Sequence, residues 1–552
     1  MKLSKNKIYI ILGIITIISI FLRFYKLGSL PWNMQEDEVM TGYVGRFILQ
    51  NGKDVYGNKL PLLYFNKFGD YYIIGPIYMK GLATFPFGVN AFAVRFPTAL
   101  FGALTTIPIF FLGSLLFGST AVGLFSALAV AIMPWTIPLG RASSEGILGG
   151  FFFLFGVYFF LRGQRQKSVK SLLIGGLFIL FTFWIYHNYR LLSSLFVFGL
   201  LIYSFFEKKE NRQNKTITSI LIGFVLSFLT LTFLIGRTTW GKGRFDQTGI
   251  LSPLSGAAIR TQELIYGDGH TPTYITRIFH NKIVGLGHEF LHQYFIYFSG
   301  DFLFIKGGKS EAYAVPEQGL LYLTFIIPLL AIFLLITDKK WMDKNRNNLL
   351  LLIYFVLISP LPSALTVVDA PNIQRSILLG LFLSLPIGLG MQSLWSRGDK
   401  KKILFFLFFV AMVGEFTYFW HDYTAHTDSF TGIYRNDAQK ELITYVKDIK
   451  ANKIYLSNNG TMPMYYLFYT KNFSPSFAGK FKNDVKIDSI NNIYFISKEC
   501  PSREKIAFKE SDVIVDSVSC LLNPEKFREL KVIKGKNELL GYRVIAPLAT
   551  QK

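Results

Sequence analysis

Residues 8–22, IYIILGIITIISIFL, form an uncharged, predominantly apolar run, and residues 30–49, LPWNMQEDEVMTGYVGRFIL, follow it with three consecutive acids. The first stretch is typical of a membrane-spanning helix. In the second stretch a proline and an asparagine precede the acids, and an apolar periodic pattern follows them. We therefore expect a helix along the membrane surface that carries the acids in its first turn. The acids are Glu36, Asp37 and Glu38.

The rest of the chain has the composition of a polytopic membrane protein. Of its 552 residues, 51% are hydrophobic and 16% are aromatic, which is too apolar for a soluble protein with a single core. About eleven stretches approach the roughly twenty apolar residues that a crossing needs. They lie near 8–22, 92–117, 121–138, 146–161, 171–186, 190–206, 216–235, 319–336, 349–367, 376–394 and 403–420. The expected fold class is a polytopic α-helical membrane protein.

Basic residues in the short loops predict the orientation of the spans. They alternate between loops, so that all of them fall on one face, which the positive-inside rule makes cytoplasmic. The N-terminus would then lie in the cytoplasm of a multi-pass plasma-membrane protein, with the first span acting as a signal anchor. Topology also explains the formal net charge of +23, so no nucleic-acid partner is expected. The loop residues are Lys2, Lys5, Lys7, Arg162, Arg165, Lys167, Lys170, Lys208, Lys209, Arg212, Lys215, Lys339, Lys340, Lys344, Arg346, Arg397, Lys400, Lys401 and Lys402.

Two predicted loops on the outer face, 23–91 and 236–318, are much longer than turns and are therefore expected to carry function. Beyond the last span, residues 421–552 alternate a helical stretch with short β-like runs. We expect two domains, a transmembrane catalytic domain over 1–420 and a small extracytoplasmic α/β domain over 421–552.

The two cysteines, Cys500 and Cys520, lie in the expected outer domain. An oxidising compartment permits a disulfide between them. The alternative is two unpaired core thiols.

The chain has no Walker loop and no Gly-rich dinucleotide fingerprint, so the energy for a reaction must come from the substrate. A sugar carried on polyprenyl phosphate is such a substrate, since its phosphate leaves readily. The enzyme then needs a base for the acceptor hydroxyl and cations for the departing phosphate. Asp37 is the candidate base, with Glu38 beside it and Asp70 as a second acid in the same loop. The alternative is that the acids only complement a helix dipole.

Several ionisable residues fall at the predicted outer ends of spans, where they are costly unless they are paired or functional. Arginine binds phosphate through a planar fork of donors, so one or two could hold the lipid phosphate. Snorkelling to lipid head groups is the alternative for any one of them. The candidate substrate-binding residues are Asp70, Arg95, Arg141, Glu145, His187, Arg190 and Arg375.

One motif suggests a different chemistry. His288, Glu289 and His292 spell HEFLH, the H-E-x-x-H spacing of zinc metalloproteases. No third ligand is evident, although Glu311 and Glu317 lie downstream. The flanks are typical of an amphipathic surface helix on which these residues simply face water.

Taken together, the motifs resemble the GT-C superfamily of membrane glycosyltransferases, of the glycosyltransferase family 39 type, which includes protein O-mannosyltransferases and the aminoarabinose transferase of lipid A. The likeness covers about residues 20–420 and rests on the order of the motifs. They are the acidic pair Asp37 and Glu38 with NGKDVYGNKLPL, then FGDYYIIGPIY, AFAVRFPTALFG, PWTIPLGRASSEG, WIYHNYR, YFSGDFLFIKGG and PNIQRS.

The resemblance implies an inverting transfer of a hexosyl or pentosyl group from a polyprenyl-phosphate donor on the outer face, with Asp37 as general base. By position it implies phosphate binding or structural support for Arg95 and Arg375. The acceptor could be a protein, a lipid or a glycan, and a divalent metal stays an open requirement. Glu36 and Gln35 depart from the aromatic or apolar residues that are common before the pair, which leaves the acceptor side undefined.

Two other classes compete with this reading. A polytopic transporter also has many spans, but transporters usually place polar residues and broken helices near the midplane. A non-enzymatic scaffold that binds through 421–552 leaves the charges at the outer ends unexplained. The sequence therefore favours a glycosyltransferase.

Overall fold

The computed structural model describes residues 4–67, 70–206, 215–252, 256–270, 272–309, 313, 315–395, 398–431, 435, 438–458, 460–481, 487–536 and 541–548. Contacts within the chain divide it into two compact units. Unit 1 comprises Met1–Tyr25, Thr98–Gly140 and Ser144–His421, and unit 2 comprises Lys26–Pro97, Arg141–Ser143 and Asp422–Lys552.

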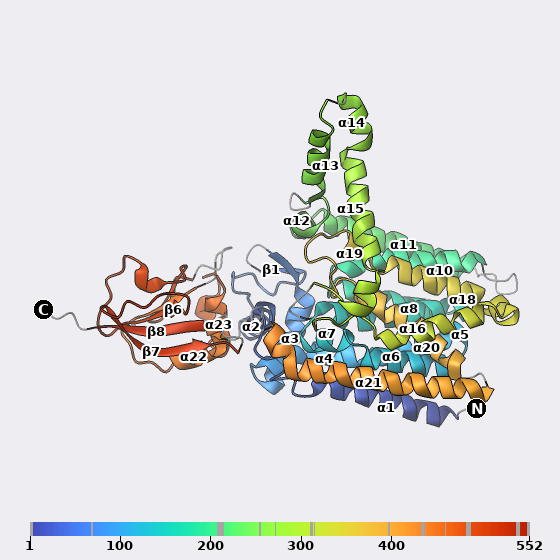
Figure 1. Cartoon of the computed structure of the whole chain (residues 1–552), viewed down its shortest axis with the longest axis horizontal. Helices are drawn as coiled ribbons and strands as arrows, with labels where there is room; N and C mark the ends of the chain where they lie inside the picture. The colour runs from blue at the N-terminus through green and yellow to red at the C-terminus, as the bar shows by residue number, and fades with distance from the viewer. Residues whose placement is uncertain are drawn as a thin grey trace. The chain divides into compact units, whose positions relative to one another are not determined.

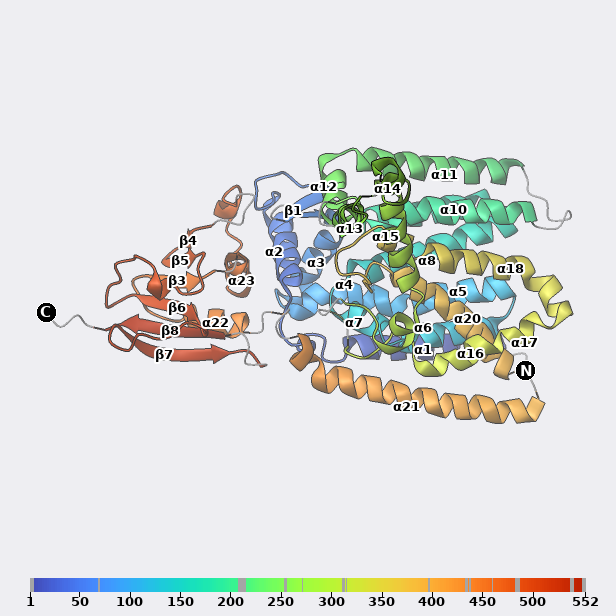
Figure 2. The same ribbon diagram turned by 45° about the horizontal axis from the view of Figure 1, so that its top comes forward.

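Apolar helices dominate unit 1 (Figures 1 and 2). Within the described residues, eight helical stretches are long and apolar enough to cross a membrane, and three shorter helices are apolar. Each of these coincides with one predicted span, so the polytopic helical fold class is confirmed. The eight stretches are Lys5–Phe24 (α1), Ala91–Phe117 (α4, Ala91–Leu104, and α5, Thr106–Phe117), Glu145–Arg165 (α8), Asn188–Phe205 (in α10, Asn188–Phe206), Lys215–Gly236 (α11), Lys339–Ala364 (α18, Lys339–Ile358, and α19, Leu361–Ala364), Ile377–Trp395 (α20) and Lys402–Thr427 (in α21, Gly398–Thr431). The shorter helices are Thr120–Ile132 (α6), Val169–Phe183 (α9) and Leu323–Ile336, which contains η3 (Leu323–Phe325), α16 (Ile326–Ala331) and α17 (Phe333–Ile336).

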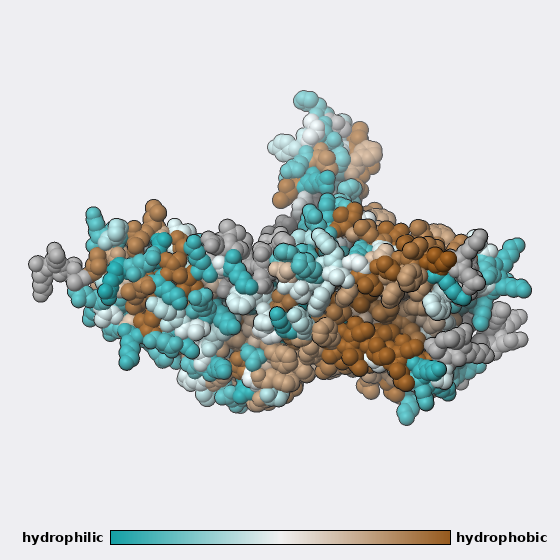
Figure 3. Space-filling view, turned by 60° about the horizontal axis from the view of Figure 1, so that its bottom comes forward, coloured by the Kyte–Doolittle hydropathy of each residue, from teal (hydrophilic) through white to brown (hydrophobic). Residues whose placement is uncertain are grey.

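The surface of this helical part is apolar where lipid would surround it. Figure 3 shows a broad hydrophobic surface over the spanning helices. Inside the bundle, a buried charge binds protein groups. The fully buried Arg23 of α1 donates to Ser19 Oγ at 2.7 Å and to Ala131 O at 3.1 Å, so it joins α1 to α6. A charge at this depth is tolerated because its hydrogen bonds are made within the protein.

The second long loop folds into a helical arm over residues 256–296. After α12 (Thr239–Thr248), the arm consists of α13 (Gly256–Gly267), α14 (Thr273–Phe279) and α15 (Lys282–Ile296), and a π-helical turn, η2 (Asp301–Ile305), follows. Figure 1 shows the arm projecting sideways from the helical bundle, across the direction of α10 and α11. At its base, the Tyr294 hydroxyl donates to Leu357 O at 2.8 Å, which ties α15 to the end of α18.

In unit 2 the acidic stretch forms α2 (Glu36–Asn51), with all three acids in the first turn as predicted. A hairpin of β1 (Tyr64–Lys67) and β2 (Asp70–Ile73) leads into α3 (Ile74–Phe87), which packs on α2. Two glycines, Gly45 and Gly81, allow that packing, because a Cβ on Gly45 would come within 2.1 Å of Ile77 O and one on Gly81 within 2.4 Å of the Gly45 carbonyl carbon.

The C-terminal part of unit 2 is an α/β fold, as predicted. The sheet order is β4-β5-β3-β6-β8-β7, with β3 parallel to both of its neighbours. The predicted β-like runs form β3, β5, β6 and β8, and Cys500 and Cys520 form a disulfide. Sequence reasoning missed β4, β7 and α23. The bounds are α22 (Gln439–Val446), β3 (Ile454–Ser457), α23 (Met462–Tyr469), β4 (Ser489–Ile490), β5 (Ile493–Ile496), β6 (Val513–Ser517), β7 (Phe527–Lys534) and β8 (Gly541–Pro547), with single 3-10 turns at Pro475–Phe477 and Pro501–Arg503.

This α/β region holds α2 directly. The Tyr43 hydroxyl of α2 donates to Asn472 O at 2.9 Å, and its ring stacks on Phe473 with centroids 5.0 Å apart. The first loop and the C-terminal segment therefore belong to one compact unit, and α21 continues to Thr431. A functional division of the chain at residue 420 stays a prediction.

Candidate functional site

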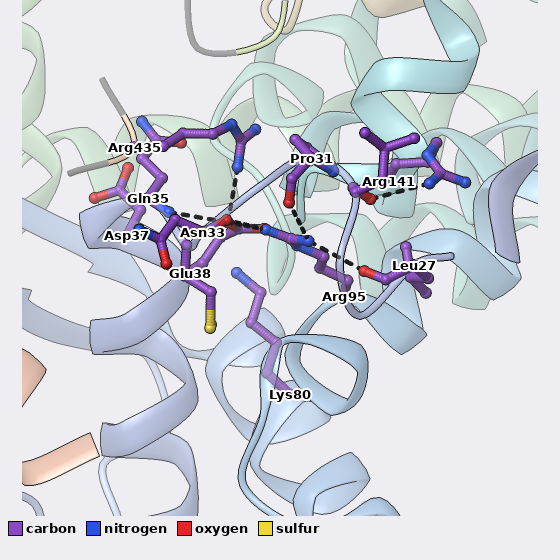
Figure 4. A network of polar contacts seen from close by, with 12 residues as sticks. Leu27, Pro31, Asn33, Gln35, Asp37, Glu38, Lys80, Arg95, Arg141 and Arg435 are labelled. Atoms are coloured by element: carbon purple, nitrogen blue, oxygen red, sulfur yellow. Dashed lines mark hydrogen bonds and ion pairs between the residues drawn. The ribbon is translucent and has the colours of Figure 1, made fainter. Parts of the chain in front are cut away.

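Glu38 anchors the first turn of α2 to two arginines (Figure 4). Its Oε1 accepts from Arg95 Nε at 2.8 Å, and its Oε2 accepts from Arg95 Nη2 and Arg435 Nη1, both at 3.1 Å. The same oxygen closes a capping box with the Gln35 backbone N–H at 3.0 Å. Burial raises the pKa of the Glu38 carboxyl, but the charges of Arg95 and Arg435 outweigh burial and hold the pKa below its ordinary value.

Arg95 uses its whole guanidinium for this anchor. Besides Glu38, it donates through Nη1 to Leu27 O and Pro31 O at 3.1 and 3.0 Å, and through Nη2 to Asn33 O at 2.5 Å. These bonds engage all five N–H donors of the group. Of the two roles inferred for Arg95, the geometry favours structural support over phosphate binding.

Asp37 sits one residue earlier and faces a different partner. The Tyr72 hydroxyl of β2 donates to Asp37 Oδ2 at 2.7 Å, and Asp37 remains partly accessible to solvent, whereas Glu38 is only 1% exposed. Asp70 begins β2 two residues before Tyr72 and is also partly accessible. The β1–β2 hairpin thus provides the tyrosine that binds Asp37, and it also contains Asp70, a second acid of the first loop.

Two further cations belong to the same unit. The buried Lys80 of α3 points toward the first turn of α2 and donates to Thr41 Oγ1 at 3.1 Å (Figure 4). The buried Arg141 donates to Leu30 O at 2.9 Å and to the Tyr423 hydroxyl at 3.2 Å. Arg141 was predicted as a site residue, whereas Lys80 was not.

The remaining predicted residues meet in unit 1. Gln374 Nε2 donates to Glu145 Oε2 at 3.0 Å, and Asn188 Nδ2 donates to Arg375 O at 2.8 Å, so the starts of α8, α10 and α20 converge. Arg375 itself donates from Nη1 to Thr366 Oγ1 at 3.0 Å and to Val368 O at 2.6 Å. In the turn before α10, His187 Nδ1 lies 3.0 Å from Arg190 Nη1. Glu145, Arg375 and the His187–Arg190 pair therefore lie at or beside these three helix starts, each with its own partners.

Three residues of the first group were missed by sequence reasoning. Arg435 lies 397 residues from the glutamate that it binds, so no local pattern could pair them. Tyr72 lies within the quoted motif FGDYYIIGPIY, but the motif does not indicate which way the side chain points. Lys80 lies two residues beyond the motif and had no signal in it.

The HEFLH motif lies on α15 in the helical arm. His288 and His292 are exposed, and Glu289 Oε1 accepts from Gln293 Nε2 at 3.0 Å. Among the residues that the structure describes, no group of three or more His, Cys, Asp or Glu side chains is placed to hold a metal ion. Glu311 lies outside the described residues. The requirement for a divalent metal remains open.

The sequence and the fold both have relatives. Residues 74–235 match the family model described as dolichyl-phosphate-mannose-protein mannosyltransferase. No curated protein sequence gives a significant match. Among solved structures, ArnT from Cupriavidus metallidurans bound to undecaprenyl phosphate matches with a TM-score of 0.52 at 10% identity, over 99% of both chains.

A second structural relative is the oligosaccharyltransferase of Archaeoglobus fulgidus in complex with zinc and sulfate. Its TM-score is 0.50 at 10% identity, over 83% of this chain and 61% of that chain. The chain thus spans less than two thirds of the length of that archaeal enzyme. At such identities the likeness establishes the fold. The chain thus shares its fold with the ArnT structure over nearly its whole length, and residues 74–235 match a mannosyltransferase family model, so the resemblance drawn from its motifs is confirmed.

Proposed function

We propose that this protein transfers a sugar from a polyprenyl-phosphate carrier to an acceptor hydroxyl on the outer face of the membrane, with inversion and with Asp37 as general base. The proposal rests on the different environments of two neighbouring acids in the first turn of α2. Glu38 is fixed by two arginines, while the neighbouring Asp37 is oriented by Tyr72 and stays partly accessible. A positioned carboxylate beside accessible space is what proton removal from a hydroxyl requires.

The reaction would proceed as a single displacement. The acceptor O–H gives its proton to the Asp37 carboxylate while its oxygen forms a bond to the anomeric carbon of the sugar. The bond between that carbon and the phosphate oxygen breaks, and the lipid phosphate leaves with the electron pair. Attack opposite to the leaving group inverts the anomeric centre.

The departing phosphate needs cations near the base. Lys80 is a buried ammonium joined through Thr41 to the first turn of α2, and Arg141 is a buried guanidinium in the same unit. A cation placed where negative charge develops stabilises the transition state more than the ground state. We assign Lys80 and Arg141 to the phosphate, and Arg95 to the support of α2, because Arg95 binds Glu38 of that helix and three backbone carbonyls of the segment before it.

The proposed lipid carrier follows from the ArnT structure, which has a similar fold. That relative was solved with undecaprenyl phosphate bound, so a polyprenyl phosphate fits the proposal for this chain. The sugar would be a hexose or a pentose, and the acceptor a protein, a lipid or a glycan.

The test is Asp37→Asn, which keeps the shape of the side chain but removes its basicity. Loss of a general base should lower the transfer rate by roughly a hundredfold to ten-thousandfold at saturating donor, with insertion and donor binding retained. Glu36→Gln is the matched control, because it lies in the same turn and should have a milder effect. Near-normal turnover in Asp37→Asn would refute the assignment and make Asp70 the next candidate.

The outer-face location has its own test. A reporter that is active only outside the cytoplasm, fused after Lys552, should be active, because the positive-inside rule predicts that the C-terminal region lies outside. A stable but silent fusion would overturn the orientation and the outer-face mechanism with it.

A further inference from the structure

The helical arm carries an unusual concentration of exposed apolar side chains. At its tip, Tyr274 and Ile278 of α14 are 72% and 64% exposed, Phe279 is 63% exposed and Ile283 at the start of α15 is 83% exposed. Further along α15, Leu291 and Phe295 are also exposed and lie on one face, four residues apart. A patch of this kind on a protein surface marks an interaction site.

The direction in which the arm runs favours the lipid bilayer as the partner of its apolar side chains. The arm leaves unit 1 at the end of the spans where α11 finishes, and it projects sideways, across the direction of α10 and α11 (Figure 1). Because the spans cross the bilayer, a segment that runs across their direction follows the membrane surface. In Figure 3 hydrophobic residues line the right-hand edge of the arm, on the side toward which the spanning helices extend. The apolar edge therefore continues the lipid-facing surface of the bundle.

The charges at the tip fit a lipid surface as well. Arg277 and Lys282 flank the apolar tip, whereas the acid Asp268 lies 3.6 Å from His280 Nε2. Apolar and aromatic residues beside cations are typical of helices that lie in the interface of a bilayer, where the cations meet lipid phosphates.

We infer that the helical arm lies in the membrane interface at that end of the spans, with Tyr274, Ile278, Phe279 and Ile283 among the acyl chains and Arg277 and Lys282 among the lipid phosphates. The arm thereby extends the membrane footprint of the protein beyond its spanning helices. This role does not depend on the identity of the reaction.

The test uses the full chain reconstituted in phospholipid nanodiscs that contain anionic lipid. Because Cys500 and Cys520 are paired, a single added cysteine can be labelled with a fluorophore without reduction. Ile278→Cys and Ile283→Cys report on the tip, and Glu525→Cys, at an exposed position of the C-terminal α/β region, is the matched control. Each label is then exposed to lipids with a nitroxide on the acyl chain and, separately, to iodide in the water.

We expect nitroxide lipids to quench the labels at 278 and 283 several-fold more than the label at 525, and iodide to show the opposite order. Quenching at 278 and 283 by iodide alone would place the arm in water and overturn the proposal. Protection from both quenchers would also overturn it, since the arm would then be covered by protein, such as a second copy of the chain.

Discussion

The carboxylate of Glu38 accepts two hydrogen bonds from the guanidinium of Arg95, at 2.8 and 3.1 Å, and both side chains are fully buried. Successive residues of a helix point about 100° apart, so this bond turns the adjacent Asp37 toward another partner, Tyr72. The two acids of the motif therefore have different roles: Glu38 anchors the helix, and Asp37 presents a more accessible carboxylate.

Arg95→Lys should destabilise the protein although it keeps the charge. A lysine ammonium has three donors and no planar fork, so it cannot replace the bonds to Glu38 and to three backbone carbonyls. We expect a loss of roughly 1–3 kcal/mol in unfolding free energy, from buried oxygens left unpaired. Thermal unfolding in detergent measures it. Unchanged stability together with weaker donor binding would instead return Arg95 to the phosphate site.

Glu38→Gln should be more damaging near neutral pH than in acid. The pKa of Glu38 in the folded protein lies below the ordinary value of 4.5, so its ionised form stabilises the fold above that value, and this contribution is lost as the pH falls through the lower folded pKa. The variant leaves two arginines without a charged partner, which costs roughly 3–5 kcal/mol. The unfolding temperatures of wild type and variant should therefore converge below pH 4.5. A constant difference across that range would contradict the ion-pair account.

Arg435→Gln tests whether the segment after α21 supports the candidate site. The variant removes a buried bond of 3.1 Å to Glu38, for which the expected cost is about 1.5–3 kcal/mol because the acceptor is charged. The transfer rate should fall as well, since the first turn of α2 loses one of its two anchors. Arg528→Gln, at an exposed position of β7, is the matched control and should change neither quantity. Equal effects of the two variants would remove Arg435 from the site.

Hydropathy predicted the spans well because each crossing needs a long apolar run whatever its neighbours are. The same pattern reasoning failed at β7, whose sequence FRELKVIK carries four charges in eight residues. That strand lies at the edge of the sheet with mostly exposed side chains, so no apolar alternation marks it.

The candidate site was predictable only in part, for a related reason. Local composition located the acids in the first turn of α2, because helix starts have their own signals. The partners of those acids are set by tertiary packing. Arg435 reaches Glu38 from the far end of the chain, and Arg95, read as a ligand for phosphate or as support, is saturated by backbone carbonyls that no sequence pattern reveals.

Replacing His288 and His292 together by alanine should leave protein level and transfer activity nearly unchanged. Both side chains are exposed on the helical arm, and the acid between them is hydrogen-bonded to Gln293. Metal content and transfer rate are measured on the same preparation. Loss of a bound metal together with all activity would revive the metalloenzyme interpretation of HEFLH.

Tyr72→Phe is the sharpest test of how the base is positioned. The variant removes only the hydroxyl that donates to Asp37 Oδ2 at 2.7 Å. Losing a hydrogen bond to a charged group should lower the turnover number by roughly tenfold, with the KM for donor little changed. Without a donor that favours the ionised carboxylate, the acid limb of the pH–rate profile should also move to higher pH.

Tyr71→Phe is the matched control for this variant. Neighbouring residues of a strand point to opposite faces, and the Tyr71 ring packs edge-on against Tyr64 with centroids 5.6 Å apart. If the hairpin has only a structural role, both variants should lower the turnover number by similar factors. The pH–rate profile should then stay unchanged. A shift of the acid limb to higher pH in Tyr72→Phe alone would tie the hydroxyl to the group that takes the proton, because looser packing would admit water and move the titration of a carboxylate to lower pH instead.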